Sequence, residues 1–242
     1  MKSIIVTGAS SGIGRAVAQR FIDEGWAVGL IARRKEALRE VAADHGNAHV
    51  LPCDVTDATA VEAAFANFVT LTGRLDVLFN NAGIFTTPAP IDEIPVQDWL
   101  DAVNVNLTGM FLCARAAFGQ MRHQSPQGGR IINNGSVSAQ TPREGSVTYT
   151  TTKHGVTGLT KTLALDGRAF NIACGQIDIG NAQSPLMDAM AARAKADGNA
   201  PPPVMDVRHV TDAIWATANL PLNANTLFQT IMATQMPYVG RG

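Results

Sequence analysis

Short apolar runs alternate with longer segments whose apolar residues recur every three or four positions, from one end of the chain to the other. Most of the short runs lack regular polar alternation, which is typical of parallel β-strands buried on both faces. The predicted strands are residues 3–7, 27–32, 48–53, 75–80, 130–134, 171–177 and 227–233.

The segments between these strands have the periodicity of amphipathic helices. Gly25 is expected to end the first helix, Thr56 or Asp57 to cap another, and Pro95 to precede a long one. Their apolar stripes are Ile13, Val17 and Phe21; Val61, Ala64, Phe65 and Phe68; and Trp99, Val103, Leu107 and Phe111. Strand–helix alternation with short connections predicts a single-domain Rossmann-type fold over residues 1–242. It would be a doubly wound parallel sheet of about seven strands with helices on both faces.

The composition narrows the class of protein. Nineteen Lys and Arg against twenty Asp and Glu leave a net charge of −1, and 46% of the 242 residues are hydrophobic. This apolar content excludes a disordered chain, and the neutral balance argues against nucleic acid or an anionic membrane as the main partner. Three widely spaced cysteines predict buried thiols in a reducing compartment rather than a disulfide framework.

Targeting, membrane and metal signals are weak. The apolar stretch 4–6 is too short for a signal peptide, and the uncharged stretch 213–240 contains several Asn, Gln and Pro residues. We therefore expect a cytoplasmic protein with no membrane span. His45 and His49 have the spacing of helical metal ligands, but Gly46 between them favours a turn, so no metal site is expected.

A glycine-rich loop follows the first predicted strand and opens the first helix. Glycines there allow a tight turn and close approach to a pyrophosphate, whose charge would lie at the helix N-terminus. The candidate residues are Gly8, Ser10, Ser11, Gly12, Ile13 and Gly14. The spacing is Gly-x-x-x-Gly-x-Gly, and no Gly-Lys-Ser/Thr follows as in a P-loop. A dinucleotide site is predicted.

The end of the second predicted strand indicates which dinucleotide. An NAD site usually has an acidic residue there, whereas this chain has Arg33, Arg34 and Lys35, with Glu36 as the first acid. Three cations at a helix start oppose its dipole, and a 2′-phosphate would supply the anion that arginine binds in a fork. We expect Arg33 and Arg34 to select NADP(H), with NAD(H) as the less favoured alternative and a solvated basic turn as the bland one.

A Tyr-x-x-x-Lys pair, Tyr149 and Lys153, occurs once in a chain with two tyrosines and five lysines. Residues four apart share a helical face, so the ammonium is expected to lower the pKa of the phenol and to suit it to proton transfer with a carbonyl or alcohol. A core tyrosine beside a surface lysine remains the alternative for the pair taken alone.

Together these motifs resemble the short-chain dehydrogenase/reductase family, over residues 3 to about 184. The glycine motif is Thr7 to Gly14, and Asn80-Asn81-Ala82-Gly83 follows the fourth predicted strand. The remaining matches are Asp54-Val55 after the third strand, Asn106-Leu107-Thr108-Gly109 in the long helix, and Ser136 thirteen residues before the tyrosine. Six motifs occur in the family's order.

The resemblance implies an oxidoreductase, a ketone or aldehyde reductase or alcohol dehydrogenase, possibly of 3-oxoacyl type. Ser136 would hydrogen-bond the carbonyl oxygen, and Tyr149 would exchange its proton. Lys153 would depress the tyrosine pKa and hold the nicotinamide ribose, with Asn106 in a proton relay and Asn104 as a competing candidate. Asp54 and Val55 would lie on the adenine side, and Asn81, Ala82 and Gly83 would line the adenosine ribose.

The pattern departs from the family after the sixth predicted strand. Gly180 keeps the family's glycine, Ile179 replaces its proline, and Ser184 stands where a threonine would contact the nicotinamide carboxamide. Asp178 has no family role and is expected to be a helix cap or surface charge. Residues 184–206 are expected to form a substrate lid. Arg143 could bind an anionic substrate, although a solvated loop charge is the favoured interpretation.

Two alternatives to the enzyme remain at this point. One is a non-catalytic NADP(H)-binding sensor or scaffold, against which the complete Ser136, Tyr149 and Lys153 set argues. The other is a cofactor-free lyase such as the dehalogenases on this fold, which replace the lysine. The resemblance also implies a homo-oligomer, a dimer or more often a homotetramer, whose subunits would meet at the uncharged C-terminal stretch. The substrate would be a small carbonyl or alcohol compound.

Overall fold

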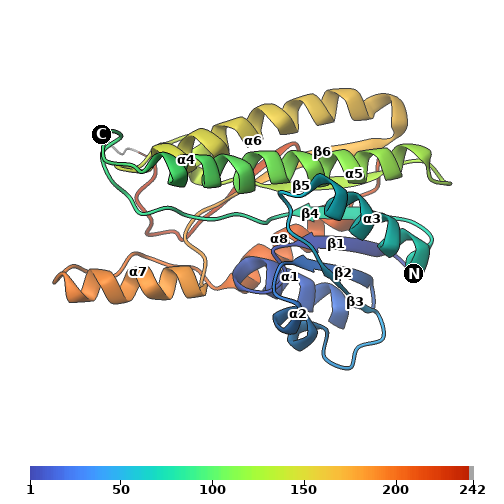
Figure 1. The fold of residues 1–242 in the computed structure, drawn as a ribbon, viewed down its shortest axis with the longest axis horizontal. Coiled ribbons are helices and arrows are strands. Elements are labelled where there is room, and N and C mark those ends of the chain that lie inside the picture. Colours follow the sequence, from blue (N-terminus) through green and yellow to red (C-terminus); the bar gives the residue numbers. More distant parts are fainter. Residues whose placement is uncertain (240–242) are drawn as a thin grey trace.

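Seven parallel strands form one sheet in the computed structural model, which describes residues 1–239 (Figure 1). Their order across the sheet is β3-β2-β1-β4-β5-β6-β7, so the chain reverses direction of travel between β1 and β4. The strands are β1 (Ser3–Thr7), β2 (Ala27–Ala32), β3 (Ala48–Pro52), β4 (Val77–Asn80), β5 (Gly129–Asn134), β6 (Ile172–Ile179) and β7 (Phe228–Ile231). The predicted doubly wound parallel sheet is confirmed.

Helices cover both faces of the sheet, and each layer packs its own apolar core. One layer holds α1 (Gly12–Asp23), α2 (Lys35–Ala42) and α8 (Val207–Asn219), whose buried side chains include Phe21, Leu38 and Ile214. The other holds α3 (Ala58–Thr72), α4 (Val96–Val103), α5 (Met110–His123) and α6 (Val147–Asp166). Phe68 and Met121 are fully buried in this second layer. Burying both strand faces explains why the strands read as continuous apolar runs.

The predicted boundaries hold best where a local signal marks them. The strands β1 and β2 have the predicted limits, and the others differ by one or two residues at an end. Asp57 caps α3 by accepting a hydrogen bond from the Ala60 backbone N–H at 3.0 Å. Gly25, with φ of +76°, follows the end of α1.

The long helix after Pro95 differs from its prediction. It is continuous in direction, but a wide π-helical stretch at Asn104–Gly109 separates α4 from α5. Trp99 and Phe111, two of its predicted stripe residues, lie on the exposed side. Smaller residues such as Ala102 and Cys113 face the sheet instead, because they allow close packing of the helix on the strands.

The carboxyl ends of six strands meet along one edge of the sheet and continue directly into the predicted site residues. Gly8 follows β1, Arg33 follows β2 and Asn81 follows β4. Ser136 lies two residues after β5, and Gly180 follows β6. In open α/β sheets this edge, at the point where strand order reverses, is where ligands bind.

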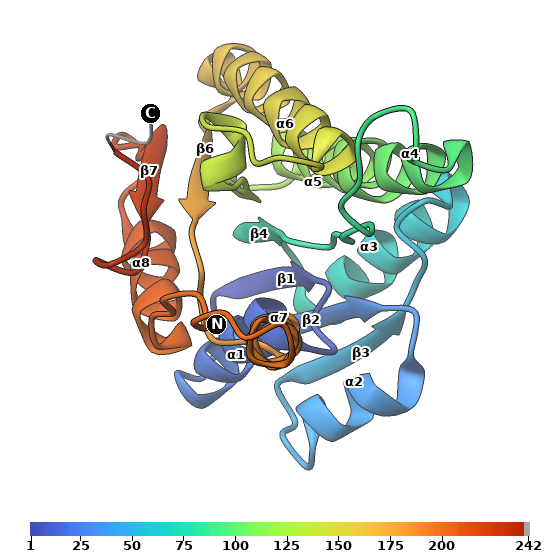
Figure 2. The same ribbon diagram turned by 90° about the vertical axis from the view of Figure 1, so that its left-hand side faces the viewer.

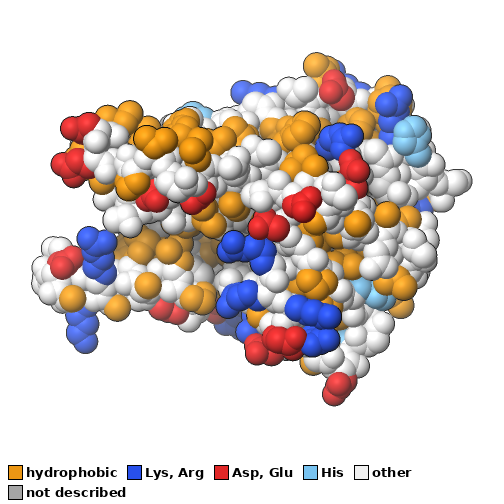
Figure 3. Space-filling view, viewed as in Figure 1, with side chains coloured by type: hydrophobic (Ala, Val, Ile, Leu, Met, Phe, Trp, Pro, Cys, Tyr) orange, Lys and Arg blue, Asp and Glu red, His pale blue; other side chains and the backbone are white. Residues whose placement is uncertain are grey.

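The helix α7 (Pro185–Ala196) projects as an arm beyond this edge (Figure 2). In the space-filling view the molecule is hollowed between this arm and the layer that contains α4 and α6 (Figure 3). In the part of the chain that the structure describes, no helix has the length and apolar character that a bilayer crossing requires. The role of residues 184–206 as a lid stays a prediction.

Candidate active site

One cavity of about 1000 Å³ at the carboxyl edge of the sheet brings together nearly all the residues predicted from the sequence. Of the four expected catalytic residues, only Asn106 is outside its lining. The predicted residues that line it are Gly8, Ser10, Ser11, Gly12, Ile13, Gly14, Arg33, Arg34, Asp54, Val55, Asn81, Ala82, Gly83, Ser136, Tyr149, Lys153, Gly180 and Ser184. They come from six strand ends and two helices, so the clustering is a product of the fold and not of chain proximity.

The glycine loop leaves room for a ligand against the backbone. Gly8 has φ of +69°, and a Cβ at Gly14 would lie 2.3 Å from the carbonyl oxygen of Gly8, so neither position accepts a side chain without strain. Ser11 caps α1 without a side-chain hydrogen bond, and the first turn contains no acidic residue. Unsatisfied N–H groups at a helix N-terminus attract an anion, so this end of the cavity fits a phosphate.

The second predicted strand end supplies positive charge. Arg33 and Arg34 are exposed and line the cavity, and Arg34 Nη2 donates to Ser10 Oγ at 3.4 Å. Across from them, hydrogen bonds from the Thr56 backbone and hydroxyl, together with the charge of Arg33, lower the pKa of Asp54. Asp54 is therefore a carboxylate at neutral pH, held by its own loop.

Asn81 joins three strand ends beneath the cavity. Its backbone N–H donates to Thr7 Oγ1 at 2.8 Å, and its Nδ2 donates to the Thr7 carbonyl at 2.9 Å. Its Oδ1 accepts from Asn134 Nδ2 at 2.8 Å. Asn81 thus fixes the ends of β1, β4 and β5 relative to one another.

The three chemical groups of the site lie on β5 and α6. Tyr149 is partly buried near the start of α6, and Ser136 hydrogen-bonds its phenol. Lys153, one turn later, is 3% exposed, and its Nζ donates to the Asn134 carbonyl at 2.7 Å. The ammonium lies 5.4 Å from the centre of the Tyr149 ring. The predicted side-by-side placement on one helical face is observed.

The ionisation of this pair differs from the prediction. Burial raises the pKa of Tyr149 to about 12 and outweighs the lowering effects of the Ser136 hydrogen bond and the charge of Arg143. Burial also lowers the pKa of Lys153 to about 8, against the opposing charge of Asp178. The expectation that Lys153 holds the tyrosine pKa below its usual value is wrong in this structure, because desolvation of the phenol dominates.

Asp178 is a second correction. It is neither a helix cap nor a surface charge, since it is 2% exposed in the interior of β6. Its Oδ1 accepts from the Ser136 backbone N–H at 2.9 Å and from Gln176 Nε2 at 2.7 Å, and Gln140 also bonds it. Burial raises its pKa, which these hydrogen bonds and the charge of Lys153 oppose. A Cβ at Gly135 would lie 2.1 Å from the same oxygen, so only glycine fits there.

The choice between Asn104 and Asn106 is favoured by burial. Asn104 is exposed, whereas Asn106 is 1% exposed within the π-helical stretch. Asn106 Oδ1 accepts from the Ile84 N–H at 2.7 Å, and its Nδ2 donates to the Ile84 carbonyl at 2.9 Å. It therefore fixes the loop after β4, and its part in a proton relay stays a prediction.

Two cavity residues near Tyr149 were missed in the sequence. Phe85 stacks on the Tyr149 ring with centroids 4.0 Å apart, although 53% of its surface is exposed. The hydroxyls of Thr86 and Thr148 share a hydrogen bond of 2.7 Å. The only available signal was position, because Phe85 and Thr86 directly follow the Asn-Asn-Ala-Gly motif.

The segment after β6 connects the cavity to α7. A Cβ at Gly180 would lie 2.7 Å from Met232 Cβ, so this glycine is required by packing. Ser184 caps α7 and accepts a hydrogen bond from the Met187 N–H at 3.4 Å. Its predicted contact with a carboxamide is compatible with its place in the cavity lining.

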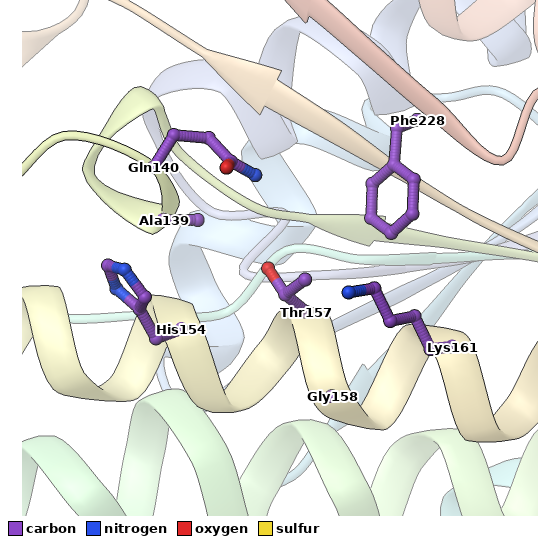
Figure 4. Close-up of a pocket in the computed structure, with 7 residues that line it drawn as sticks. All are labelled: Ala139, Gln140, His154, Thr157, Gly158, Lys161 and Phe228. Atoms are coloured by element: carbon purple, nitrogen blue, oxygen red, sulfur yellow. The ribbon is translucent and has the colours of Figure 1, made fainter.

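A second hollow, of about 500 Å³, contains none of the predicted residues. His154, Thr157 and Lys161 of α6 point toward Gln140 and toward Phe228 of β7 (Figure 4). Lys161 Nζ lies 5.9 Å from the Phe228 ring centre. This hollow lies on the side of α6 away from Tyr149 and offers no set of groups for acid–base chemistry.

Comparison with known proteins agrees with the motifs. Residues 2–195 match the family model for short chain dehydrogenase. A 3beta-hydroxysteroid dehydrogenase of Mediterraneibacter gnavus is 36% identical over 198 residues, which cover 80% of this chain and 71% of that protein. Sulfoacetaldehyde reductase 2 of Chromohalobacter salexigens is 29% identical over 244 residues, covering 97% of this chain and 95% of that one.

A solved structure is similar over the full length. The closed form of a serine dehydrogenase complexed with NADP+ superposes with a TM-score of 0.89 at 26% identity, covering 99% of this chain and 98% of that one. The matched model spans most of the chain, and the relatives are named as dehydrogenases or reductases. The protein with this sequence belongs to the short-chain dehydrogenase/reductase family of oxidoreductases.

Proposed function

We propose that this protein interconverts a carbonyl group and an alcohol with NADP(H) as the redox partner. The observation that carries the proposal is the shared cavity, in which Ser136, Tyr149 and Lys153 stand at one end and the glycine loop at the other. A sensor or scaffold would have no use for a buried phenol–ammonium pair in its ligand cavity. The names of the relatives support the same class of reaction.

The residues present fit a nicotinamide dinucleotide. Gly8 and Gly14 leave a cradle that a Cβ would fill, and the uncapped N–H groups of α1 face it. Arg33 and Arg34 would bind a 2′-phosphate, which favours NADP(H) over NAD(H), and the NADP+ in the serine dehydrogenase structure supports this choice. When bound, the nicotinamide would exchange a hydride with the substrate carbon.

The protein's own groups would manage the proton and the charge on oxygen. Ser136 and Tyr149 would both hydrogen-bond the substrate oxygen, where negative charge develops during reduction. A phenol with a pKa of about 12 keeps its proton at neutral pH, so Tyr149 is ready to donate it to that oxygen. With a pKa of about 8, Lys153 is mostly charged at neutral pH and stabilises the phenolate that remains.

The substrate-facing part of the cavity is built from residues 84–90, residues 143–149 and α7. We propose that residues 184–206 act as the lid over it, with Met187 and Met190 facing the substrate. Sulfoacetaldehyde and serine, for which two relatives are named, are both compact and polar. A small substrate is therefore favoured over a long acyl chain or a steroid.

Loss of NADPH absorbance in the presence of a panel of ketones, aldehydes and 3-oxoacyl thioesters tests the proposal. We expect turnover with at least one class, and a Tyr149→Phe variant should lose it by at least about a thousandfold while it still quenches or enhances NADPH fluorescence on binding. Tight NADPH binding with no turnover of any compound would favour the sensor. Near-normal turnover by Tyr149→Phe would refute the proton-donor role.

A further inference from the structure

Arg143 places a positive charge at the chemical end of the cavity. It lies on the loop between β5 and α6, is partly buried, and lines the same cavity as Ser136 and Tyr149. Its charge lowers the pKa of the Tyr149 phenol, which shows that the guanidinium is close to the position of proton transfer. The favoured sequence interpretation, a solvated loop charge, does not describe this placement.

The guanidinium is held in place by a buried partner. Arg143 Nη2 donates to Asn181 Oδ1 at 3.1 Å, and Asn181 is only 8% exposed. Asn181 Nδ2 in turn donates to the Pro203 carbonyl at 3.0 Å, and its own carbonyl accepts from Met205 N–H at 2.9 Å. Arg143 is thereby fixed to the end of β6 and to the segment that returns from α7. Fixing a long side chain before binding reduces the entropy that a ligand must remove.

A second arginine reaches the same part of the cavity from α7. Arg193 lines it together with Ala194 and Met190, and its pairing with Asp197 is long, at 3.9 Å between well exposed groups. The acidic residues in this part of the lining are Glu144 and Asp197. Such an exposed pair is weak, so Arg193 can exchange Asp197 for a ligand anion.

We propose that Arg143, assisted by Arg193, binds an oxyanion group of the substrate, so that the preferred substrates are compact oxo acids that carry a carboxylate or sulfonate. The inference rests on the proposed function, because it assigns the substrate end of the same site. Because the Arg143 charge acts on the phenol that receives or donates the proton, only a few bonds can separate the anionic group from the reacting carbonyl. Planar bidentate recognition of carboxylate or sulfonate is what a guanidinium provides.

Paired substrates test this directly. Short oxo acids such as 3-oxobutanoate are compared with their methyl esters, and sulfoacetaldehyde with its uncharged analogue propanal, for the wild type and for Arg143→Met. We expect the ratio of kcat/KM for the charged compound to that for its neutral partner to fall by about 10- to 100-fold, carried mainly by KM. Using the ratio removes any change in Tyr149 reactivity that affects both compounds equally. Arg143→Lys should restore part of it, and Arg168→Met, an exposed arginine outside the cavity, should leave it unchanged.

Calorimetric binding of 3-hydroxybutanoate to the enzyme saturated with NADP+ gives a second readout that needs no turnover. Binding by the wild type and its loss in Arg143→Met would support the anion site even if the tested oxo acids are not reduced, and that result would count against the proposed function alone. Equal ratios in the wild type and Arg143→Met would overturn the inference and leave the proposed function intact. A rise in KM for NADPH instead of for the anion would also overturn it, since it would assign Arg143 to the dinucleotide.

Discussion

Replacing Lys153 by methionine should stabilise the folded protein at neutral pH. Folding lowers the pKa of this lysine from 10.5 to about 8, and each pKa unit corresponds to about 1.4 kcal/mol. The buried charge therefore destabilises the fold by about 3 kcal/mol at pH 7. Methionine fills similar space without charge but loses the hydrogen bond to Asn134, which offsets about 1 kcal/mol. A net gain of about 2 kcal/mol is expected.

The pH dependence of this gain carries the argument. Because the folded pKa is the lower one, the unfolded state binds more protons between about pH 8 and 10.5, and the wild type regains stability as the pH rises through that window. The advantage of Lys153→Met should thus shrink by about 2 kcal/mol between pH 7 and pH 10. The buried thiols have raised pKa values and destabilise both proteins at alkaline pH, so the difference between the two proteins is the quantity to measure.

Urea unfolding followed by tryptophan fluorescence gives this difference, because Trp26 and Trp215 pack together in the core between α1 and α8. Lys161→Met, an exposed lysine on the same helix, is the matched control and should show little change at any pH. A Lys153→Met protein that is less stable than the wild type at pH 7, or a difference that does not vary with pH, would refute the reasoning. Activity is expected to be lost in either case.

Two further variants test the other charges of the cavity. The double variant Arg33→Asp, Arg34→Ala should lower the ratio of kcat/KM for NADPH to that for NADH by about 100-fold or more, since each arginine–phosphate contact contributes about 1.5–3 kcal/mol; equal losses for both cofactors would contradict the assignment. Asp178→Asn keeps the shape of the side chain and removes its charge, which raises the pKa of Tyr149 in the wild type. The pH profile of alcohol oxidation should therefore shift toward lower pH, and an unchanged profile would show that Asp178 acts through shape alone.

The sheet and most of the cavity were predictable because both depend on local signals. Continuous apolar runs mark strands that are covered on both faces, and parallel strands place the residues that follow them at one edge. Gly8, Asn81 and Ser136 all follow strands, so their meeting in one cavity is a consequence of topology. The pairing of Tyr149 with Lys153 follows from helical spacing alone.

The parts that were not predictable depend on contacts between distant segments. The burial of Asp178 is made possible by the Ser136 N–H and by Gln176, and no periodicity in 172–179 records a partner that comes from another strand. The pKa of Tyr149 is set by how much water its surroundings exclude, whereas spacing reports only which charges are near. Trp99 fits a helical stripe, but a stripe does not say which side of the helix meets the sheet.

The π-helical stretch Asn104–Gly109 makes the length of this helix as important as its composition. A wide turn contains more residues than an α-helical turn, so removing a single residue would convert it to regular helix and rotate everything beyond it by about 100°. The buried side of α5, including Met110 and Cys113, would then leave the sheet, while Asn106 would turn away from Ile84. Deletions here should be far less tolerated than substitutions at exposed positions such as Thr108, so relatives of this protein should vary in residue type but not in spacing between Pro95 and Met110.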